Sequence, residues 1–150
     1  MFSQSNNMFS KTCEYAIRAI LFIAQKSKQG VKVSIKDVAK GIDSPEFFLG
    51  KILQELSRKG IVKSLKGPTG GFYLDDESMQ YSLADVVIAI DGDKIFNGCG
   101  LGLKQCSEKQ PCPIHKEFKK IRSDIFKLLE NSKLGEFNDL LDKRLAVLKR

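Results

Sequence analysis

The sequence predicts a mainly α-helical fold that carries one small β-hairpin and a long helix toward its C-terminal end. Three features support this prediction. Apolar residues recur at helical spacing over much of the chain, serine and glycine residues stand where helices would begin and end, and a glycine-rich turn separates two short apolar stretches. The length of 150 residues and the hydrophobic fraction of 42% are enough for a buried core.

The first part of the chain predicts three helices in succession. Ser10 is placed to cap a helix with one apolar face, and Ser34, three residues ahead of an aspartate, has the spacing of a capping box for a short second helix. Gly41 is placed to end that second helix in a left-handed turn. Ser44, followed by a proline, suits the cap of a third helix over 45–59.

A β-hairpin is expected after the third helix. Residues 61–66 predict one strand, the glycine-rich stretch 67–71 predicts a tight turn, and 72–74 predict the returning strand. Three helices followed by such a hairpin have the order of a winged helix-turn-helix domain, which we expect over 10–90. Residues 1–9 are expected to form a flexible leader.

The rest of the chain predicts a loop and two further helices. A short helix is expected at 83–90, a loop at 91–113, and a long helix with a last helix at 134–148 within the segment 114–150. Apolar residues of the long helix recur at heptad spacing, which favours a dimer seam over an intramolecular core helix. The expected dimerisation residues are Ile114, Phe118, Ile121, Ile125 and Leu128.

The charge distribution predicts a polyanionic partner. The formal net charge is +7, and residues 1–66 alone carry 12 basic and 5 acidic side chains. The alternative is a solvated surface that only keeps the protein in solution. No apolar run approaches the ~20 residues that a membrane span needs, and the start of the chain lacks the features of a signal peptide. We therefore expect a cytoplasmic protein with no membrane partner.

The third predicted helix is the expected DNA-reading element, because the second helix of a helix-turn-helix motif enters the major groove. Glutamine can bond adenine edges, and lysine can reach guanine or phosphate. An aromatic residue there could instead pack in the core beside Phe48, and the serine could act only as a cap. The expected DNA-binding residues of this helix are Ser44, Phe47, Gly50, Lys51 and Gln54.

The hairpin is expected to bring further residues to DNA. Lys66 and Thr69 lie at or near its turn, and Lys63 lies on its first strand, where all three could touch the backbone or a groove. The alternative for the lysines is a charged strand edge that discourages aggregation. One small domain offers few contacts, so specific binding is expected from a homodimer on a palindromic double-stranded operator.

Three cysteines and the single histidine fall within 17 residues of the predicted loop. Such soft donors on one loop of an intracellular protein favour a metal centre over disulfides or free redox thiols. A zinc ion is one candidate, but the wide spacing favours a larger iron–sulfur cluster. The expected ligands are Cys99, Cys106, Cys112 and His115. Cys13, which lies in the first predicted helix, is expected to be an apolar core residue.

Several motifs resemble one known family. The sequence FSKTCEYA from Phe9, GPTGGF from Gly67, and the cysteine loop ending in CPIH at His115 resemble the Rrf2 family of winged helix-turn-helix transcriptional regulators, in its iron–sulfur-binding branch. The resemblance covers roughly residues 8–141. It implies a homodimer with an N-terminal winged helix, a long dimerisation helix and a cluster-binding loop between them.

The resemblance also implies a ligand set. Three loop cysteines would hold a [2Fe–2S] cluster, which we prefer, or a [4Fe–4S] cluster. In IscR-like members a histidine in the place of His115 completes the set, whereas NsrR-like members use an acidic residue in the place of Glu14 of the partner subunit. We prefer His115, since Glu14 could be an ordinary surface acid. The sequence departs from the best-known member at Gly50, where that member carries an acidic residue, so its operator cannot be carried over.

The sequence therefore predicts a transcriptional regulator whose operator affinity depends on an iron–sulfur cluster that senses redox state, nitric oxide or cluster supply. The alternatives are a cluster-free or zinc-binding regulator, and a small iron–sulfur electron carrier or scaffold, which would not need the basic block over 1–66. An enzyme is not expected, because the sequence offers no nucleophile–base pair and no phosphate-binding loop.

Overall fold

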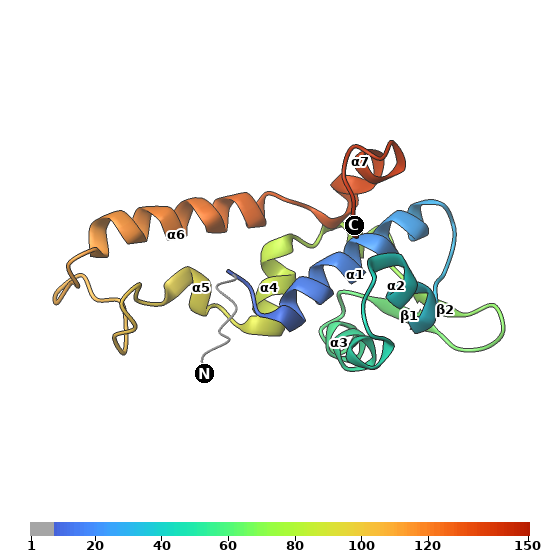
Figure 1. Ribbon diagram of the computed structural model, residues 1–150, viewed down its shortest axis with the longest axis horizontal. Helices are drawn as coiled ribbons and strands as arrows, with labels where there is room; N and C mark the ends of the chain where they lie inside the picture. Colours follow the sequence, from blue (N-terminus) through green and yellow to red (C-terminus); the bar gives the residue numbers. More distant parts are fainter. Residues whose placement is uncertain (1–7) are drawn as a thin grey trace.

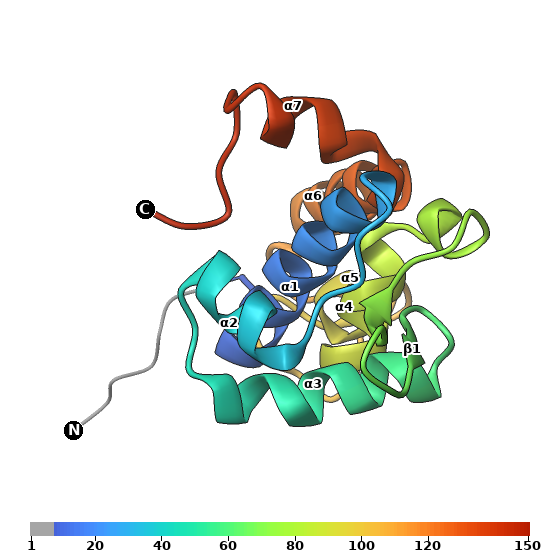
Figure 2. The ribbon, with the colours of Figure 1, turned by 90° about the vertical axis from the view of Figure 1, so that its right-hand side faces the viewer.

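The structure is a computed structural model that describes residues 8–150, so most of the expected leader lies outside the described residues. The order of its elements confirms the predicted mainly α fold with a small two-stranded sheet. Figure 1 shows the long helix of residues 115–130 extending to the side, away from the first three helices, and Figure 2 shows the helix of residues 46–58 on the opposite side of the first helix from the last helix. The helices and strands are α1 (Lys11–Lys28), α2 (Ile35–Ile42), α3 (Glu46–Arg58), β1 (Lys63–Leu65), β2 (Gly71–Tyr73), α4 (Leu83–Asp91), α5 (Lys94–Asn97), α6 (His115–Glu130) and α7 (Asn138–Asp142), with 3-10 turns at Ser78–Gln80 and Leu134–Phe137.

Helix α1 is the centre of the fold. Ser10 caps it as predicted, because its side chain accepts a hydrogen bond from the Cys13 amide. The helix contacts α2, α3, α4 and α7. The expectation that Cys13 is a core residue is confirmed, since it is fully buried, and burial raises the pKa of its thiol to about 12. The residues that α1 buries are Cys13, Ala16, Ala19, Ile20, Leu21, Ile23 and Ala24.

Helix α2 begins as predicted and ends later than predicted. Ser34 and Asp37 form the reciprocal capping box. The prediction that Gly41 stops the helix is wrong, because the helix runs through Ile42 and Asp43 adopts the left-handed conformation, with φ of 55°. A side chain at Gly41 would overlap the ring of Phe22. This glycine therefore permits close packing of α2 against α1 rather than a turn.

Helix α3 begins without the predicted cap. Pro45 occupies the cap position, and no side-chain hydrogen bond closes the helix start. Ser44 is not a cap: its hydroxyl oxygen is buried and has no hydrogen-bond partner among the described residues. Pro45 itself takes the extended cap position, so the helix begins one residue later than predicted and its first amides receive no side-chain hydrogen bond.

The hairpin is present but its strands are shorter than predicted. Lys63 pairs with Tyr73, and Leu65 pairs with Gly71, in an antiparallel register. Residues 61–62 belong to the buried core rather than to the strand. At Gly71 the backbone has φ of 139°, and an added Cβ would meet the Val33 backbone at 2.8 Å. The tight turn and the close approach to Val33 therefore require glycine there.

The C-terminal region differs from the prediction of a last helix over 134–148. The chain forms a short 3-10 turn and α7, and then continues without regular structure. Arg18 of α1 donates to the carbonyl of Leu148, and Lys149 donates to the carbonyl of Lys40, so the tail is held along α1 and α2. None of the helices within 8–150 is long and apolar enough to cross a membrane.

The packing at Gly41 gives a test of the fold. We expect Gly41→Ala to destabilise the protein by about 1–3 kcal/mol, because the new methyl group must displace the Phe22 ring. The measurement is the free energy of unfolding in denaturant. Gly50→Ala is the matched control, because α3 leaves open space at Gly50 and alanine should stabilise the helix by up to ~1 kcal/mol. Equal effects of the two substitutions would contradict the packing role of Gly41.

Candidate nucleic-acid interface and cysteine loop

Helix α3 turns one face to the core and the other to the outside. Its inner face consists of the buried residues Leu49, Ile52, Leu53 and Leu56. On the outer face, Lys51 and Gln54 are exposed, and Gly50 has no neighbour within 4 Å of where a Cβ would lie. The hydrophobic face therefore fixes the orientation of α3, and the expected DNA-binding residues 50, 51 and 54 share the open side.

An aromatic pair marks the start of α3. Phe47 is 77% exposed, and its ring centroid lies 4.1 Å from that of Phe48. The alternative that Phe47 packs in the core is therefore wrong. Tyr15 of α1 stacks on Phe48, with 5.9 Å between their ring centroids. Phe47 thus projects from the surface, and it packs on Phe48, which in turn packs on Tyr15 of α1.

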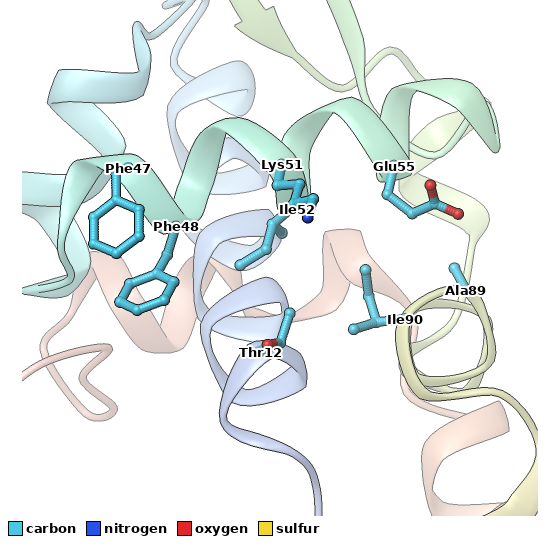
Figure 3. Close-up of a pocket in the computed structure, with 8 residues that line it drawn as sticks. All are labelled: Thr12, Phe47, Phe48, Lys51, Ile52, Glu55, Ala89 and Ile90. Atoms are coloured by element: carbon cyan, nitrogen blue, oxygen red, sulfur yellow. The ribbon is translucent and has the colours of Figure 1, made fainter.

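A hollow of about 450 Å³ separates the start of α3 from α1 and α4. Figure 3 shows Phe47, Phe48 and Lys51 on α3 facing Thr12 of α1 and Ile90 of α4. The space is mostly apolar, because aromatic and aliphatic side chains form its walls. Helix α4 therefore reaches the underside of α3 next to its exposed residues.

The hairpin presents its turn to the outside. Lys66 and Thr69 are exposed, as a contact with DNA would require. Lys63 differs, because its ammonium group lies 2.7 Å from a carboxylate oxygen of Asp75. This pair raises the pKa of Lys63 and, with the backbone amide of Ser78, lowers the pKa of Asp75 to about 2. Lys63 is thus held in an ion pair with Asp75 on the surface of its own domain.

The predicted seam of α6 is divided between two environments. Ile121 and Leu128 are 54% and 65% exposed, and Ile114 is exposed before the helix begins. Phe118 and Ile125 are half-buried, and Ile125 packs against a second apolar cluster around α4. Part of the heptad pattern therefore holds α6 to its own chain, and part remains open to solvent.

The cysteines form two neighbouring pairs of soft donors. The Sγ atom of Cys106 lies 3.2 Å from Nδ1 of His115. Cys99 accepts a hydrogen bond from the backbone amide of Leu101, whose N lies 3.4 Å from Sγ, and the side chain of Cys112 also acts on this thiol. Backbone amides, Leu101 foremost, lower the pKa of the Cys99 thiol. The loop thus favours a thiolate at Cys99, the form that binds metals.

Both ring nitrogens of His115 lie close to a neighbouring group, although only Nδ1 has hydrogen-bond geometry among the described residues. Its side chain is only 9% exposed, and Nε2 lies 3.2 Å from a carboxylate oxygen of Glu108. Lys119 also contacts Glu108, and these two partners, Lys119 first, lower the pKa of Glu108. A carboxylate behind a histidine is the usual arrangement for orienting a ligating imidazole. Nδ1 is the nitrogen that faces the cysteine.

The sequence analysis missed Arg122, which lies on the inner face of α6. It is 6% exposed, and its Nη2 lies 3.1 Å from the Sγ atom of Cys106. Its Nη1 donates to the carbonyls of Phe96 and Gly98. The available signal was its position seven residues after His115, which places both on one face of a helix. A single arginine on the apolar inner face of a predicted helix indicates a buried cation that needs nearby acceptors.

The cysteine and histidine side chains of the loop do not converge on one point. No three histidine, cysteine or acidic side chains within residues 8–150 converge closely enough to hold a single ion. Zinc needs four donors around one point, so the two separate pairs fit a single ion poorly. A hollow of about 600 Å³ between α5 and α6 is lined by Cys106 and Arg122, whereas Cys99 lines a separate hollow. The donor types, three thiols and one imidazole on one loop, are those that can hold an iron–sulfur cluster, and the buried Nε atom of Arg122 near Cys106 has no hydrogen-bond partner among the described residues.

Comparisons of sequence agree with this architecture. Residues 9–140 match the model of the Rrf2 family, described as "Iron-dependent Transcriptional regulator". A relative from Aquifex aeolicus (strain VF5), provisionally named as an HTH-type transcriptional regulator, is 30% identical over 145 residues, with 95% of this chain and 99% of the relative covered. The HTH-type transcriptional regulator IscR of Vibrio cholerae is 29% identical, with 91% and 83% covered.

Solved structures share the fold. CymR of B. subtilis matches with a TM-score of 0.71 and 20% identity, over 87% of this chain and 95% of that one. IscR of T. potens matches with a TM-score of 0.68 and 22% identity, over 89% and 86%. The family and the sequence relatives are regulators, which confirms the prediction that the protein is not an enzyme. With its winged helix, its hairpin and a family match over most of its length, this chain belongs to the Rrf2 family of transcriptional regulators.

Proposed function

We propose that this regulator binds a palindromic double-stranded DNA operator as a homodimer, and that an iron–sulfur cluster on Cys99, Cys106 and Cys112 sets its affinity. The observation that carries the proposal is the gathering of soft donors on one loop, where the Sγ atom of Cys106 lies 3.2 Å from Nδ1 of His115. The name of the matched family, which includes iron dependence, and the IscR relatives support it.

The DNA contact is proposed for α3 and the turn of the hairpin. Lys51, Gln54 and the exposed ring of Phe47 share one side of the molecule, and Lys66 and Thr69 extend it at the turn. Gln54 has the donor and acceptor needed for an adenine edge, and Lys66 suits a phosphate. Gly50 leaves room for close approach of a base edge. Ser44 and Lys63 are secondary candidates, because the hydroxyl of Ser44 is buried and Lys63 is paired with Asp75.

The cluster site is proposed to include His115 as the fourth ligand. Its Nδ1 already faces Cys106, and Glu108 lies at its other nitrogen. Glu14 of the partner subunit is the rival ligand; within this chain Glu14 lies on α1, 3.7 Å from Lys11. When bound, a [2Fe–2S] cluster, or alternatively a [4Fe–4S] cluster, supplies a centre that gains or loses electrons and reacts with small oxidants or nitric oxide.

Helix α4 is the proposed route from the loop to the DNA-binding surface within one chain. It contacts α6 on one side and both α1 and α3 on the other. Ile88 lines the hollow next to Arg122, whereas Ile90 lines the hollow beneath α3. The open residues Ile121 and Leu128 of α6 are proposed to form the seam with a second copy, which sets the spacing of the two α3 helices. We expect this regulator to act in the cytoplasm.

The DNA-binding surface gives a first test of this function. Gln54→Ala should cost ~1–3 kcal/mol of operator binding and relax the preference at one base pair. Lys66→Ala should weaken binding to all sequences alike and reduce the slope of log K against log salt by about 1. The measurement is a salt titration of binding by fluorescence anisotropy. Lys28→Ala, an exposed cation at the end of α1, is the control, and an equal loss with this variant would argue against the proposed surface.

The ligand set gives a second test. Anaerobically purified protein should be coloured and should contain iron and sulfide, and Cys106→Ala should remove both. His115→Ala should lower cluster retention by ~10- to 100-fold or more, whereas Glu14→Ala should leave it near that of the unaltered protein. Zinc without sulfide in the unaltered protein would favour the zinc-binding regulator. If Glu14→Ala lost the cluster and His115→Ala retained it, the fourth ligand would be Glu14 of the partner subunit.

A further inference from the structure

Arg122 is a buried cation without an acidic partner among the described residues. It is 6% exposed, and no carboxylate oxygen lies within ion-pair distance of it in residues 8–150. Arginine stays protonated in proteins, and a buried charge is costly unless an opposite charge or strong hydrogen bonds compensate it. The structure therefore raises the question of which group balances this charge.

The contacts of Arg122 balance its charge only in part. Two carbonyl oxygens, of Phe96 at 3.3 Å and Gly98 at 2.9 Å, accept from Nη1. The guanidinium carbon lies 5.6 Å from the centroid of the Phe118 ring. Its Nε atom is buried and has no hydrogen-bond partner among the described residues. These neighbours are neutral, and they leave an unmatched positive charge.

The acids nearest to this site have other partners. Glu108 lines the same hollow, but Lys119 and His115 contact its carboxylate. Asp93 also lines the hollow and accepts a hydrogen bond from Asn97 at 2.9 Å. The remaining neighbour of Arg122 is the Sγ atom of Cys106, at 3.1 Å. The negative charge that suits this position is therefore that of a cysteine-held metal centre, whose thiolate ligands are anionic.

We propose that Arg122 is the counter-charge of the iron–sulfur cluster and the side chain through which the cluster holds α5 and the loop against α6. This inference rests on the proposed function, and it assigns a positioning role rather than a ligand. The two Nη atoms connect Cys106 of the loop with the end of α5, while the backbone of Arg122 belongs to α6. Binding of an anionic centre at Cys106 tightens this connection, and its loss leaves a buried cation that favours opening of the loop.

The shape of arginine is suited to this role. Its planar fork donates to several acceptors at once, whereas the ammonium group of lysine is a compact charge. A lysine at position 122 would keep the charge but would lose part of the connection between the loop and α5. A glutamine would keep a donor but would lose the charge. These two substitutions therefore separate the electrostatic part of the role from the hydrogen-bonding part.

The test uses the full chain, loaded anaerobically with iron and sulfide, and compares Arg122→Gln and Arg122→Lys with the unaltered protein. The first measurement is the rate at which a chelator removes the cluster, followed by visible absorption. Arg122→Gln should lose the cluster ~10- to 100-fold faster, as expected for residues that support metal ligands. Arg122→Lys should fall between the two. Lys120→Met, which removes an exposed cation from the same helix, should match the unaltered protein.

The second measurement is amide hydrogen exchange over Lys94–Asn97 and the following loop, with and without the cluster. In the unaltered protein the cluster should slow exchange there, and Arg122→Gln should abolish that protection. Equal cluster retention and equal protection in Arg122→Gln and the unaltered protein would overturn this inference while the proposed function stands. Failure of the unaltered protein to hold iron and sulfide would overturn both. If Arg122→Gln does not fold, Arg122→Met and Arg122→Lys provide the same comparison of charge.

Discussion

The apolar stripe of α1 is the constraint on which the rest of the structure depends. Ala16, Ala19, Ile20 and Ile23 are fully buried, and the small alanines let neighbouring helices approach closely. Helices α2, α3 and α4 all pack on this stripe. The outer face of α3 is therefore set by contacts on its inner face. A change in how α1 packs would reorient the proposed DNA-binding surface even if no residue on that surface changed.

The molecule places its two chemically distinct surfaces at opposite ends. Figure 1 shows the hairpin at one end and the loop that precedes α6 at the other. The main contacts of α6 are with α4 and α5, and α4 in turn contacts α1 and α3. In the proposed function, a signal from the loop would pass through α4 inside one chain or through the exposed side of α6 to a second copy. Residues of α4 line both hollows: Ile88 lines the one beside Arg122, and Ala89 and Ile90 line the one beneath α3.

Most features that depend on neighbouring residues could be predicted from the sequence, with the cap at Ser44 as an exception, whereas features that depend on distant residues could not. The caps at Ser10 and Ser34 and the glycine-rich hairpin turn are local, and the structure confirms them. Gly41 was misread because its reason is the ring of Phe22, about twenty residues away. The tail after α7 is held by a hydrogen bond from Arg18 to the carbonyl of Leu148 and does not form the helix that its apolar spacing predicted. The cysteines could be found by composition, but a buried arginine opposite Cys106 is a contact across the fold.

The loop is anchored on both sides, and this makes it suited to transmit a change. At its start, Asp91 at the end of α4 accepts hydrogen bonds from both the amide and the hydroxyl of Ser10, the residue that caps α1. At its far side, Arg122 connects Cys106 and the end of α5 to α6. A rearrangement of the loop must therefore pull on the first turn of α1 or on α6. Helix α1 packs against α3, and α6 carries the exposed apolar residues Ile121 and Leu128. A displacement of either α1 or α6 would therefore change how two copies lie on DNA in the proposed homodimer.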